Sequence, residues 1–443
     1  MEPKKNMLTT AIVGLMGLAV AGSALSATLQ DAVQQSLSTN PEVLITTNER
    51  LAREQEVAQA KGGYLPTIDL SGGYGTEWSD NATTAVNPGE DVWLARREAA
   101  IDLRQMVWDG LATKSEVDRQ KARVNSQAYT VQGTSQNTAL RTAQVYLELL
   151  RQQELLQLAK GNLAAHQRIY DQIKLRSDSG VGRKADLDQI QGRLALAESN
   201  VLASENNVRE AEANYLRVVG AMPEDLVRPV SVADALPMTV EEAVAIGLEG
   251  HPTLKSAGAD VGAALAQHEA AKSAYSPRID IEVGRTWNNN WDGREGDDED
   301  MTAMLRLRWN VFNGFKDVAR RKQTAHLINE AKAVMDNTHR QVEESVRLSW
   351  TSYQTTKAQL DYLKQHMESS KKTRDAYTKQ FNIGQRTLLD VLDTENEVFE
   401  SSKAYITGDY TNQYAQYRVL NGMGKLLDTL AVAAPEEGKP LGQ

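Results

Sequence analysis

The chain has 443 residues, of which 41% are hydrophobic and 6% aromatic, and it carries a formal net charge of −10 and no cysteine. The acidic balance argues against nucleic acid as the main partner. The lack of cysteine excludes disulfides, thiolate metal sites and an acylated N-terminal cysteine, so any membrane attachment must come from the folded polypeptide.

The N-terminal segment has the pattern of an export signal. Lys4 and Lys5 precede an apolar run over residues 7–21, and the small residues that follow include the sequence Ala24-Leu25-Ser26. The run is shorter than the ~20 apolar residues that a helix needs to cross a bilayer. We therefore predict a cleaved signal peptide at 1–26 and a mature protein that begins near residue 27.

The rest of the chain is an internal duplication. TLQDAVQQSLSTNP at 28–41 matches TVEEAVAIGLEGHP at 239–252, and GGYLPTIDLSGGYG at 62–75 matches SAYSPRIDIEVGRT at 273–286, both with an offset of 211. VWDG at 107–110 then matches VFNG at 311–314, and GRKADLDQIQ at 182–191 matches GQRTLLDVLD at 384–393. We predict a first structural repeat at 27–237, a second at 238–430 and a C-terminal tail at 431–443. Each repeat contains a helix, a β-hairpin, a long helix and a short helix.

The first helix of each repeat is predicted from apolar residues spaced three and four apart. In the first repeat it covers 28–61 and ends at Gly62-Gly63, and its counterpart covers 240–274.

Two strands follow the first helix in each repeat, because the apolar period changes to two. One apolar face contains Ile68, Leu70, Tyr74 and Trp78, and the return strand places Ala99, Ile101, Leu103 and Val107 together. The second repeat has Ile279, Ile281, Val283 and Trp287, then Leu305, Leu307, Trp309 and Val311. This alternation fits strands of an outer-membrane barrel, and equally an ordinary antiparallel sheet with one wet face.

Aromatic placement favours the membrane interpretation. Six of the seven tryptophans lie in or beside these strands, as expected for an interfacial belt in contact with outer-membrane lipid. They are Trp78, Trp93, Trp108, Trp287, Trp291 and Trp309. Four strands cannot close a membrane barrel, which needs at least about eight, whereas three copies would supply about twelve. The strand count therefore predicts a homotrimer that shares one barrel. The acidic hairpin tips at 79–92 and 288–300 lack the spacing of a calcium loop and are predicted to be solvated.

A very long helix follows each return strand, at 111–177 and at 315–381. Apolar residues recur in seven-residue steps, for example Val117, Val124 and Val131, or Val346, Tyr353 and Leu360. Each helix would be about 100 Å long at 1.5 Å per residue, and the heptad repeat predicts coiled-coil packing. The shorter helices at 29–61 and 186–220, stacked end to end, would match the first long helix, and 240–274 with 387–422 would match the second. Three chains packed this way form either a closed cylinder or a solid bundle or rod.

These motifs resemble those of the TolC-type outer-membrane factors, over about residues 28–430. The resemblance is carried by NP at the first helix, YLP and YSP at the strand entries, VWDG and VFNG at the strand exits, FNIGQRTLLDVLDTENEV at 381–398 and YRVLNGMG after it. It implies an α+β membrane protein in the outer membrane of a Gram-negative bacterium. Its fold would be a trimeric duct, with a shared 12-stranded barrel continuous with a coiled-coil α-barrel in the periplasm. It also implies a periplasmic adaptor and an inner-membrane ABC or other transporter as partners.

The resemblance assigns a gate to the periplasmic end. Asp390 and Asp393 correspond to acidic rings that line the constriction, Arg386 to a residue in the links that hold it shut, and Asp188 to an aspartate of the same network. Two family features differ: Phe381 replaces a hydrogen-bonding tyrosine, and Asp186 is an additional carboxylate.

The residues themselves agree with this assignment. Asp390 and Asp393 are one turn apart on one helix face, and threefold symmetry would gather their carboxylates around a pore that favours cations. The alternative is a solvated helix face.

No catalytic or ligand-binding motif is apparent. The six histidines lack metal-ligand spacing, and no G-x-S-x-G, Walker or dinucleotide motif occurs. SGVGRK at 179–184 is predicted to be a helix-helix turn. We expect no enzymatic activity, cofactor or metal.

The predicted function is a passive outer-membrane exit duct for type I protein secretion, gated by an acidic ring and gripped by the adaptor at about 178–188 and 380–390. Multidrug efflux is the first alternative. A periplasmic coiled-coil scaffold is the second.

Overall fold

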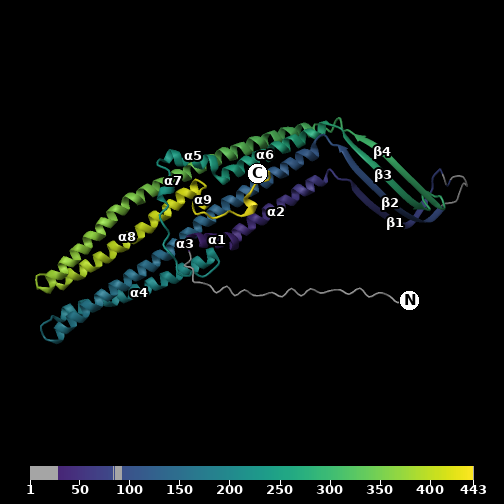
Figure 1. Cartoon of the computed structure of the whole chain (residues 1–443). Helices are drawn as coiled ribbons and strands as arrows, with labels where there is room; N and C mark the ends of the chain where they lie inside the picture. The colour runs from purple at the N-terminus through teal and green to yellow at the C-terminus, as the bar shows by residue number, and fades with distance from the viewer. Residues whose placement is uncertain (1–27, 83, 85–91, 443) are drawn as a thin grey trace, which may run out of the picture.

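The computed structural model describes residues 28–82, 84 and 92–442. The predicted signal peptide at 1–26 and much of the first hairpin tip at 79–92 lie outside the described residues. The described chain is elongated, with a sheet at one end and two helical hairpins at the other (Figure 1). The C-terminus lies between these ends, close to the middle of the helical part.

One antiparallel sheet contains all four predicted strands in the order β1-β2-β3-β4. The strands are β1 (Thr67–Ser79), β2 (Val92–Trp108), β3 (Arg278–Asn289) and β4 (Asp297–Arg308). Leu70 lies opposite Ile101, and Leu103 lies opposite Val283. Directly opposed residues share a face, so the predicted apolar residues of neighbouring strands do lie together. The other face carries ion pairs such as Arg96 with Glu77, at 2.9 Å.

Two details of the predicted strands are wrong. The register of β2 shifts between Met106 and Trp108, so Val107 is the extra residue of a bulge and Trp108 takes the apolar position opposite Ile279. The hairpin of β3 and β4 also extends further toward its tip than predicted. Asp297–Asp300 pairs with β3, while Trp309 and Val311 lie beyond the end of β4. Main-chain hydrogen bonds continue through this acidic stretch because they do not depend on side-chain polarity.

The first helix of each repeat is two helices, which corrects the single helix predicted from periodicity. They are α1 (Leu29–Thr39) and α2 (Pro41–Gly62), then α5 (Val240–Gly250) and α6 (Pro252–Lys272). Proline lacks an N–H and disfavours a helical residue before it, so each break falls at the residue preceding a proline. Asn40 and His251 are those residues, and both cap the next helix. Asn40 Oδ1 accepts from the Glu42 N–H at 3.0 Å, and His251 Nδ1 accepts from the Thr253 N–H at 3.2 Å.

The long helices are present at close to their predicted bounds. They are α3 (Ala112–Asp178) and α7 (Lys316–Asn382), each of 67 residues. The return helices α4 (Lys184–Val219) and α8 (Leu388–Gly422) pack along the tip halves of α3 and α7. Nearer the sheet, α2, α3, α6 and α7 lie side by side (Figure 1). Of the helices that the structure describes, none is both long and apolar enough to cross a membrane.

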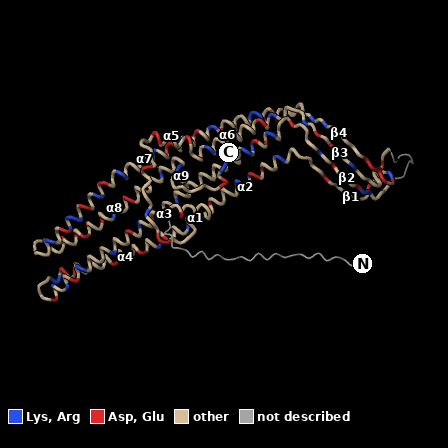
Figure 2. The backbone as a smooth tube through the Cα atoms, viewed as in Figure 1, with Lys and Arg blue, Asp and Glu red and all other residues tan. Residues whose placement is uncertain are grey.

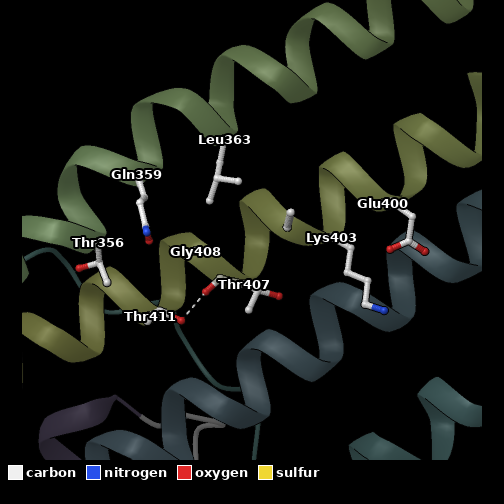
Figure 3. Close-up of a pocket in the computed structure, with 9 residues that line it drawn as sticks. Thr356, Gln359, Leu363, Glu400, Lys403, Thr407, Gly408 and Thr411 are labelled. Carbon is white, nitrogen blue, oxygen red and sulfur yellow. Dashed lines mark hydrogen bonds between the residues drawn. The ribbon is translucent and has the colours of Figure 1, made fainter. Parts of the chain in front are cut away.

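The seven-residue steps mark the packed seams of the coiled coils. Val124 and Val131 of α3 and Val346 of α7 are fully buried. Gly408 of α8 allows a close approach to α7, since a Cβ there would lie 2.7 Å from Leu363 Cδ1. Figure 3 shows Leu363 directed from α7 toward this part of α8. Polar and charged side chains, including Gln359, Lys403 and Thr411, line the shallow groove beside the contact.

The main hydrophobic core lies in the helical part, where the two repeats pack against each other. Two non-helical segments cross this core. The linker between the repeats is fastened by the buried Tyr146, whose hydroxyl donates to the Val227 carbonyl at 2.6 Å. The C-terminal segment folds back along α3. There Gln132 donates to the Gly438 carbonyl at 2.6 Å, and Asn125 accepts from the Leu441 N–H at 2.7 Å. A short helix, α9 (Leu426–Thr429), starts this return and places Leu426 in the core.

The histidine cap of α6 predicts a pH-dependent stability. Burial lowers the pKa of His251 below its ordinary value of 6.5, so the unfolded chain binds the proton more readily. The stability contributed by this cap is therefore fully present above pH 6.5 and is lost as the pH falls below 6.5 through the lowered pKa of His251 in the folded chain. We expect the melting temperature to fall less between pH 7.5 and pH 5.5 in His251→Asn than in the wild type. Asn40 performs the same capping without a titrating group, so Asn40→Ala, which removes a cap but no histidine, is the control. An unchanged pH dependence in His251→Asn would contradict this role.

Candidate gate at the helical tips

Both helical hairpins turn through a glycine in the left-handed region. Gly180 follows α3 with a φ of 74°, and Gly384 follows α7 with a φ of 78°. After α3, the N–H groups of Val181 and Gly182 bond to the Arg176 carbonyl at 3.1 and 2.9 Å. These bonds satisfy carbonyls that the helix end leaves free. The predicted turn at 179–184 is confirmed, and the tips of the two hairpins end close to each other (Figure 1).

A small apolar cluster joins the hairpins near their tips. Its buried members are Ile173 of α3, Ile190 of α4, and Leu388 and Leu392 of α8. Ile190 and Leu392 are both 0% exposed, and they occupy equivalent positions in the duplication. Phe381 of α7 is partly buried against the same cluster. The two repeats therefore share one core at the tips, separate from the main core of the helical part.

Asp390 performs a structural task that the sequence did not reveal. Thr387 and Asp390 form a capping box at the start of α8: the Asp390 carboxylate accepts from the Thr387 N–H at 3.0 Å, and Thr387 Oγ1 accepts from the Asp390 N–H at 3.3 Å. The hydrogen bonds from the Thr387 backbone and hydroxyl, followed by the charge of Arg386, lower the pKa of Asp390 below 3.8. The carboxylate is therefore ionised at neutral pH, as an acidic gate would require.

Arg386 is held mainly by α7. Its Nε donates to Gln380 Oε1 at 3.0 Å, and its guanidinium lies 4.1 Å from the centre of the Tyr377 ring. Its Nη1 is 4.0 Å from Asp390 Oδ1, at the outer limit of an ion pair. Tyr377 and Gln380 thus set where this positive charge lies.

Asp393 has a different counter-charge, which sequence reasoning missed. Arg193 of α4 places its Nη2 3.1 Å from Asp393 Oδ1. The offset of 202 between the repeats gave a signal for this pair, because it puts residue 193 level with residue 395, within one turn of Asp393. Using that signal requires knowing that α4 and α8 are neighbours at the tips.

The remaining predicted gate residues are not joined to Arg386 within one chain. In the part of the chain that the structure describes, neither Asp186 nor Asp188 makes a side-chain hydrogen bond or ion pair. Asp186 lies in the first turn of α4, where a carboxylate is favoured by the helix dipole. Phe381 faces the guanidinium of Arg176, at 5.2 Å from the ring centre. A cation–π contact therefore occupies the position where the resemblance implies a tyrosine hydrogen bond.

Charge at the tips is mixed in sign and gathers no metal ligands. Acidic and basic residues both occur along the ends of the hairpins (Figure 2). Over residues 28–82, 84 and 92–442, no group of three or more His, Cys, Asp or Glu is placed to hold a metal ion. The charged residues at the tips are instead arranged as ion pairs, such as Arg193 with Asp393.

Comparison with known proteins identifies the family. The model described as "Outer membrane efflux protein" matches residues 32–221 and 246–425, one segment in each repeat. The chain belongs to the outer membrane efflux protein family. It is therefore an outer-membrane channel protein of a Gram-negative bacterium, with its helical part in the periplasm, and not an enzyme.

Individual relatives match along nearly the whole chain. The outer membrane efflux protein BepC of Brucella suis biovar 1 (strain 1330) is 25% identical, over 95% of this chain and 90% of that protein. The proteases secretion protein PrtF of Dickeya chrysanthemi is 22% identical, over 90% of this chain and 88% of that protein. The crystal structure of the Campylobacter jejuni CmeC outer membrane channel superposes with a TM-score of 0.77 at 14% identity, covering 96% of this chain and 94% of that chain.

The tryptophans fall into two groups at the two ends of the sheet of this efflux-family protein. Trp78 lies directly opposite Trp93 near the hairpin tips, and Trp287 is on the same face of the sheet, with Trp291 in the adjoining turn. Trp108 and Trp309 lie at the end that leads into the helices. All six side chains are partly or largely exposed in a single chain. Their placement at the lipid interfaces stays a prediction.

Proposed function

We propose that three copies of this chain form a gated exit duct across the outer membrane, as the last component of a tripartite export system. The observation that carries the proposal is the pair of carboxylates, Asp390 and Asp393, on α8 where the hairpins converge. The duct would be passive, and the energy would come from an inner-membrane transporter, of the ABC or another type.

The trimer is supported by the two edges of the sheet. The edge strands β1 and β4 have 13 and 12 residues, and in the described part of the chain each has a neighbouring strand on one side only. Pairing β4 of one chain with β1 of the next would satisfy both edges, and three copies would supply about twelve strands. The outer-membrane location favours this duct over the periplasmic scaffold considered from sequence.

The gate is supported by the charges at the tips. In a trimer, Asp390 and Asp393 would form two rings one helical turn apart, which would attract cations and repel anions. Arg386 and Arg193 would balance these rings and limit their self-repulsion. Asp186 and Asp188, which have no link to Arg386 within one chain, would contact a neighbouring chain, whereas Phe381 would support the gate through its contacts with the tip cluster and Arg176.

The adaptor is proposed to grip the two turns at about 178–188 and 380–390. Apolar side chains are exposed there, including Val181 at 84% and Ile383 at 69%. Exposed apolar surface at the end of each hairpin is a candidate contact for a protein partner.

For the cargo, we propose protein, as in a type I secretion system. The similarity to the proteases secretion protein PrtF over most of both chains supports this choice. The similarity to the efflux protein BepC, at slightly higher identity, favours small-molecule efflux as the second candidate.

The gate is tested by single-channel conductance of the purified protein in planar bilayers. We expect small, cation-selective openings from the wild type. In Asp390→Asn/Asp393→Asn we expect larger openings whose K⁺/Cl⁻ permeability ratio moves toward one, because the acidic rings are neutralised. Thr387→Ala is the matched control, since it disrupts the start of α8 but keeps both carboxylates. An unchanged permeability ratio in the double variant, or an equal change in Thr387→Ala, would contradict an acidic gate. No conductance from folded wild type would contradict the duct itself.

The cargo is tested in a Gram-negative host that lacks its own outer-membrane channel of this family. The host would carry this chain with a matched adaptor and ABC transporter, and separately with a matched drug transporter. We expect a type I substrate to appear in the medium, with little gain of dye resistance. Dye resistance without secretion would show efflux to be the function. The same host without this chain is the control for both readouts.

A further inference from the structure

The ion pair between Arg193 and Asp393 joins the two repeats at the tips. Arg193 belongs to the first repeat and Asp393 to the second, and their side chains are 3.1 Å apart. Other described ion pairs near the tips stay within one hairpin, as do Arg374 with Glu395 and His366 with Glu397. In the described chain, Arg193 with Asp393 is the ion pair that joins the tip of one hairpin to the other.

The pair lies at the edge of the apolar cluster that joins the hairpins. Arg193 is three residues beyond the buried Ile190 and on the same face of α4, while Asp393 directly follows the buried Leu392. The pair itself is open to solvent, since 33% of the Arg193 side chain and 59% of the Asp393 side chain remain exposed. Separating the hairpins would have to break this pair.

Arg193 is also the positive charge in contact with Asp393. Arg386, the basic residue that the resemblance points to, lies 4.0 Å from Asp390 and is oriented by Gln380 and Tyr377 on α7. Asp393 is therefore balanced by Arg193 and not by Arg386. Each of the two gate carboxylates has its own guanidinium, one from each repeat.

We propose that Arg193 is a positioning and selectivity residue of the gate, which ties α4 to α8 through Asp393 and neutralises that carboxylate while the gate is closed. This inference rests on the proposed duct. The permeant species in question are small inorganic cations, because the group that Arg193 masks is a carboxylate. When the pair opens, Asp393 is released toward the pore and raises the preference for cations.

The test uses full-length protein in planar bilayers with KCl, comparing open probability and K⁺/Cl⁻ selectivity. We expect Arg193→Ala to increase the open probability by about two- to fivefold, the range that an exposed ion pair provides. It should also raise the K⁺/Cl⁻ permeability ratio, because Asp393 loses its counter-charge. Arg183→Ala is the control: Arg183 is an exposed residue of the turn before α4 with no described side-chain partner, and its removal changes the net charge equally.

A charge swap separates this specific pair from a general effect of charge. Arg193→Asp should give a larger rise in both quantities, and the double variant Arg193→Asp/Asp393→Arg should return open probability toward the wild-type value. Equal effects of Arg193→Ala and Arg183→Ala, or no recovery in the double variant, would overturn the inference. If Asp390→Asn/Asp393→Asn changes the permeability ratio but Arg193→Ala changes neither quantity, the role of Arg193 is overturned and the acidic gate is not.

Discussion

The constraint on which this structure depends is the hydrogen-bonding need of two exposed strand edges. Within residues 28–82, 84 and 92–442, β1 and β4 each present a row of main-chain groups that no neighbouring strand pairs along one side. In the hydrocarbon of a membrane each unsatisfied group costs several kcal/mol, so a lone four-stranded sheet is not stable there. The chain belongs to an outer-membrane family, and the edges therefore have to be covered by protein. Pairing between copies of the same chain, as proposed above, would satisfy this need with no further component.

The internal duplication gives the sheet and the periplasmic helical part equivalent contributions from each repeat. Each repeat contributes one hairpin of strands and one long helix of 67 residues, paired with a shorter return helix. The two repeats meet in the main core and again in the small cluster around Ile190 and Leu392. Between these two contacts, each hairpin consists of a long helix paired with its return helix (Figure 1). Because the tip cluster is separate from the main core, parting of the hairpins at their tips, as the proposed gate requires, would leave the main core packed.

Much of this architecture follows from the sequence, because periodicity reports directly on burial. The seven-residue steps through Val124 and Val131 and the alternation through Ile68 and Leu70 predicted the type of each element and the face that packs. The departures occurred where a single residue overrides a periodic pattern. Proline at 41 and 252 split helices whose apolar spacing continues across the break, and the bulge at Val107 reversed the alternation at the end of β2.

The candidate site was less predictable, since it depends on contacts between the repeats. Asp390 and Asp393 were found from their spacing and from the family resemblance, but their partners were not. Arg193 lies 200 residues from Asp393 in sequence, and only the packing of α4 beside α8 shows that they meet. The return of the C-terminal segment along α3 likewise needs coordinates, because its polar contacts carry no periodic signal.

Cysteine cross-linking between β1 and β4 tests the central claim most directly, and the natural chain has no cysteine to interfere. Ser71→Cys would be combined in turn with cysteine at 298, 300, 302, 304 and 306 of β4, all on the same face of the sheet. After mild oxidation of membranes, closure by three chains predicts one favoured β4 position, which yields a reducible covalent trimer. Cysteine on β2 in place of β4 should give no link between chains. The absence of any cross-linked trimer across the whole set, with folded protein in the membrane, would contradict the shared sheet and the duct built upon it.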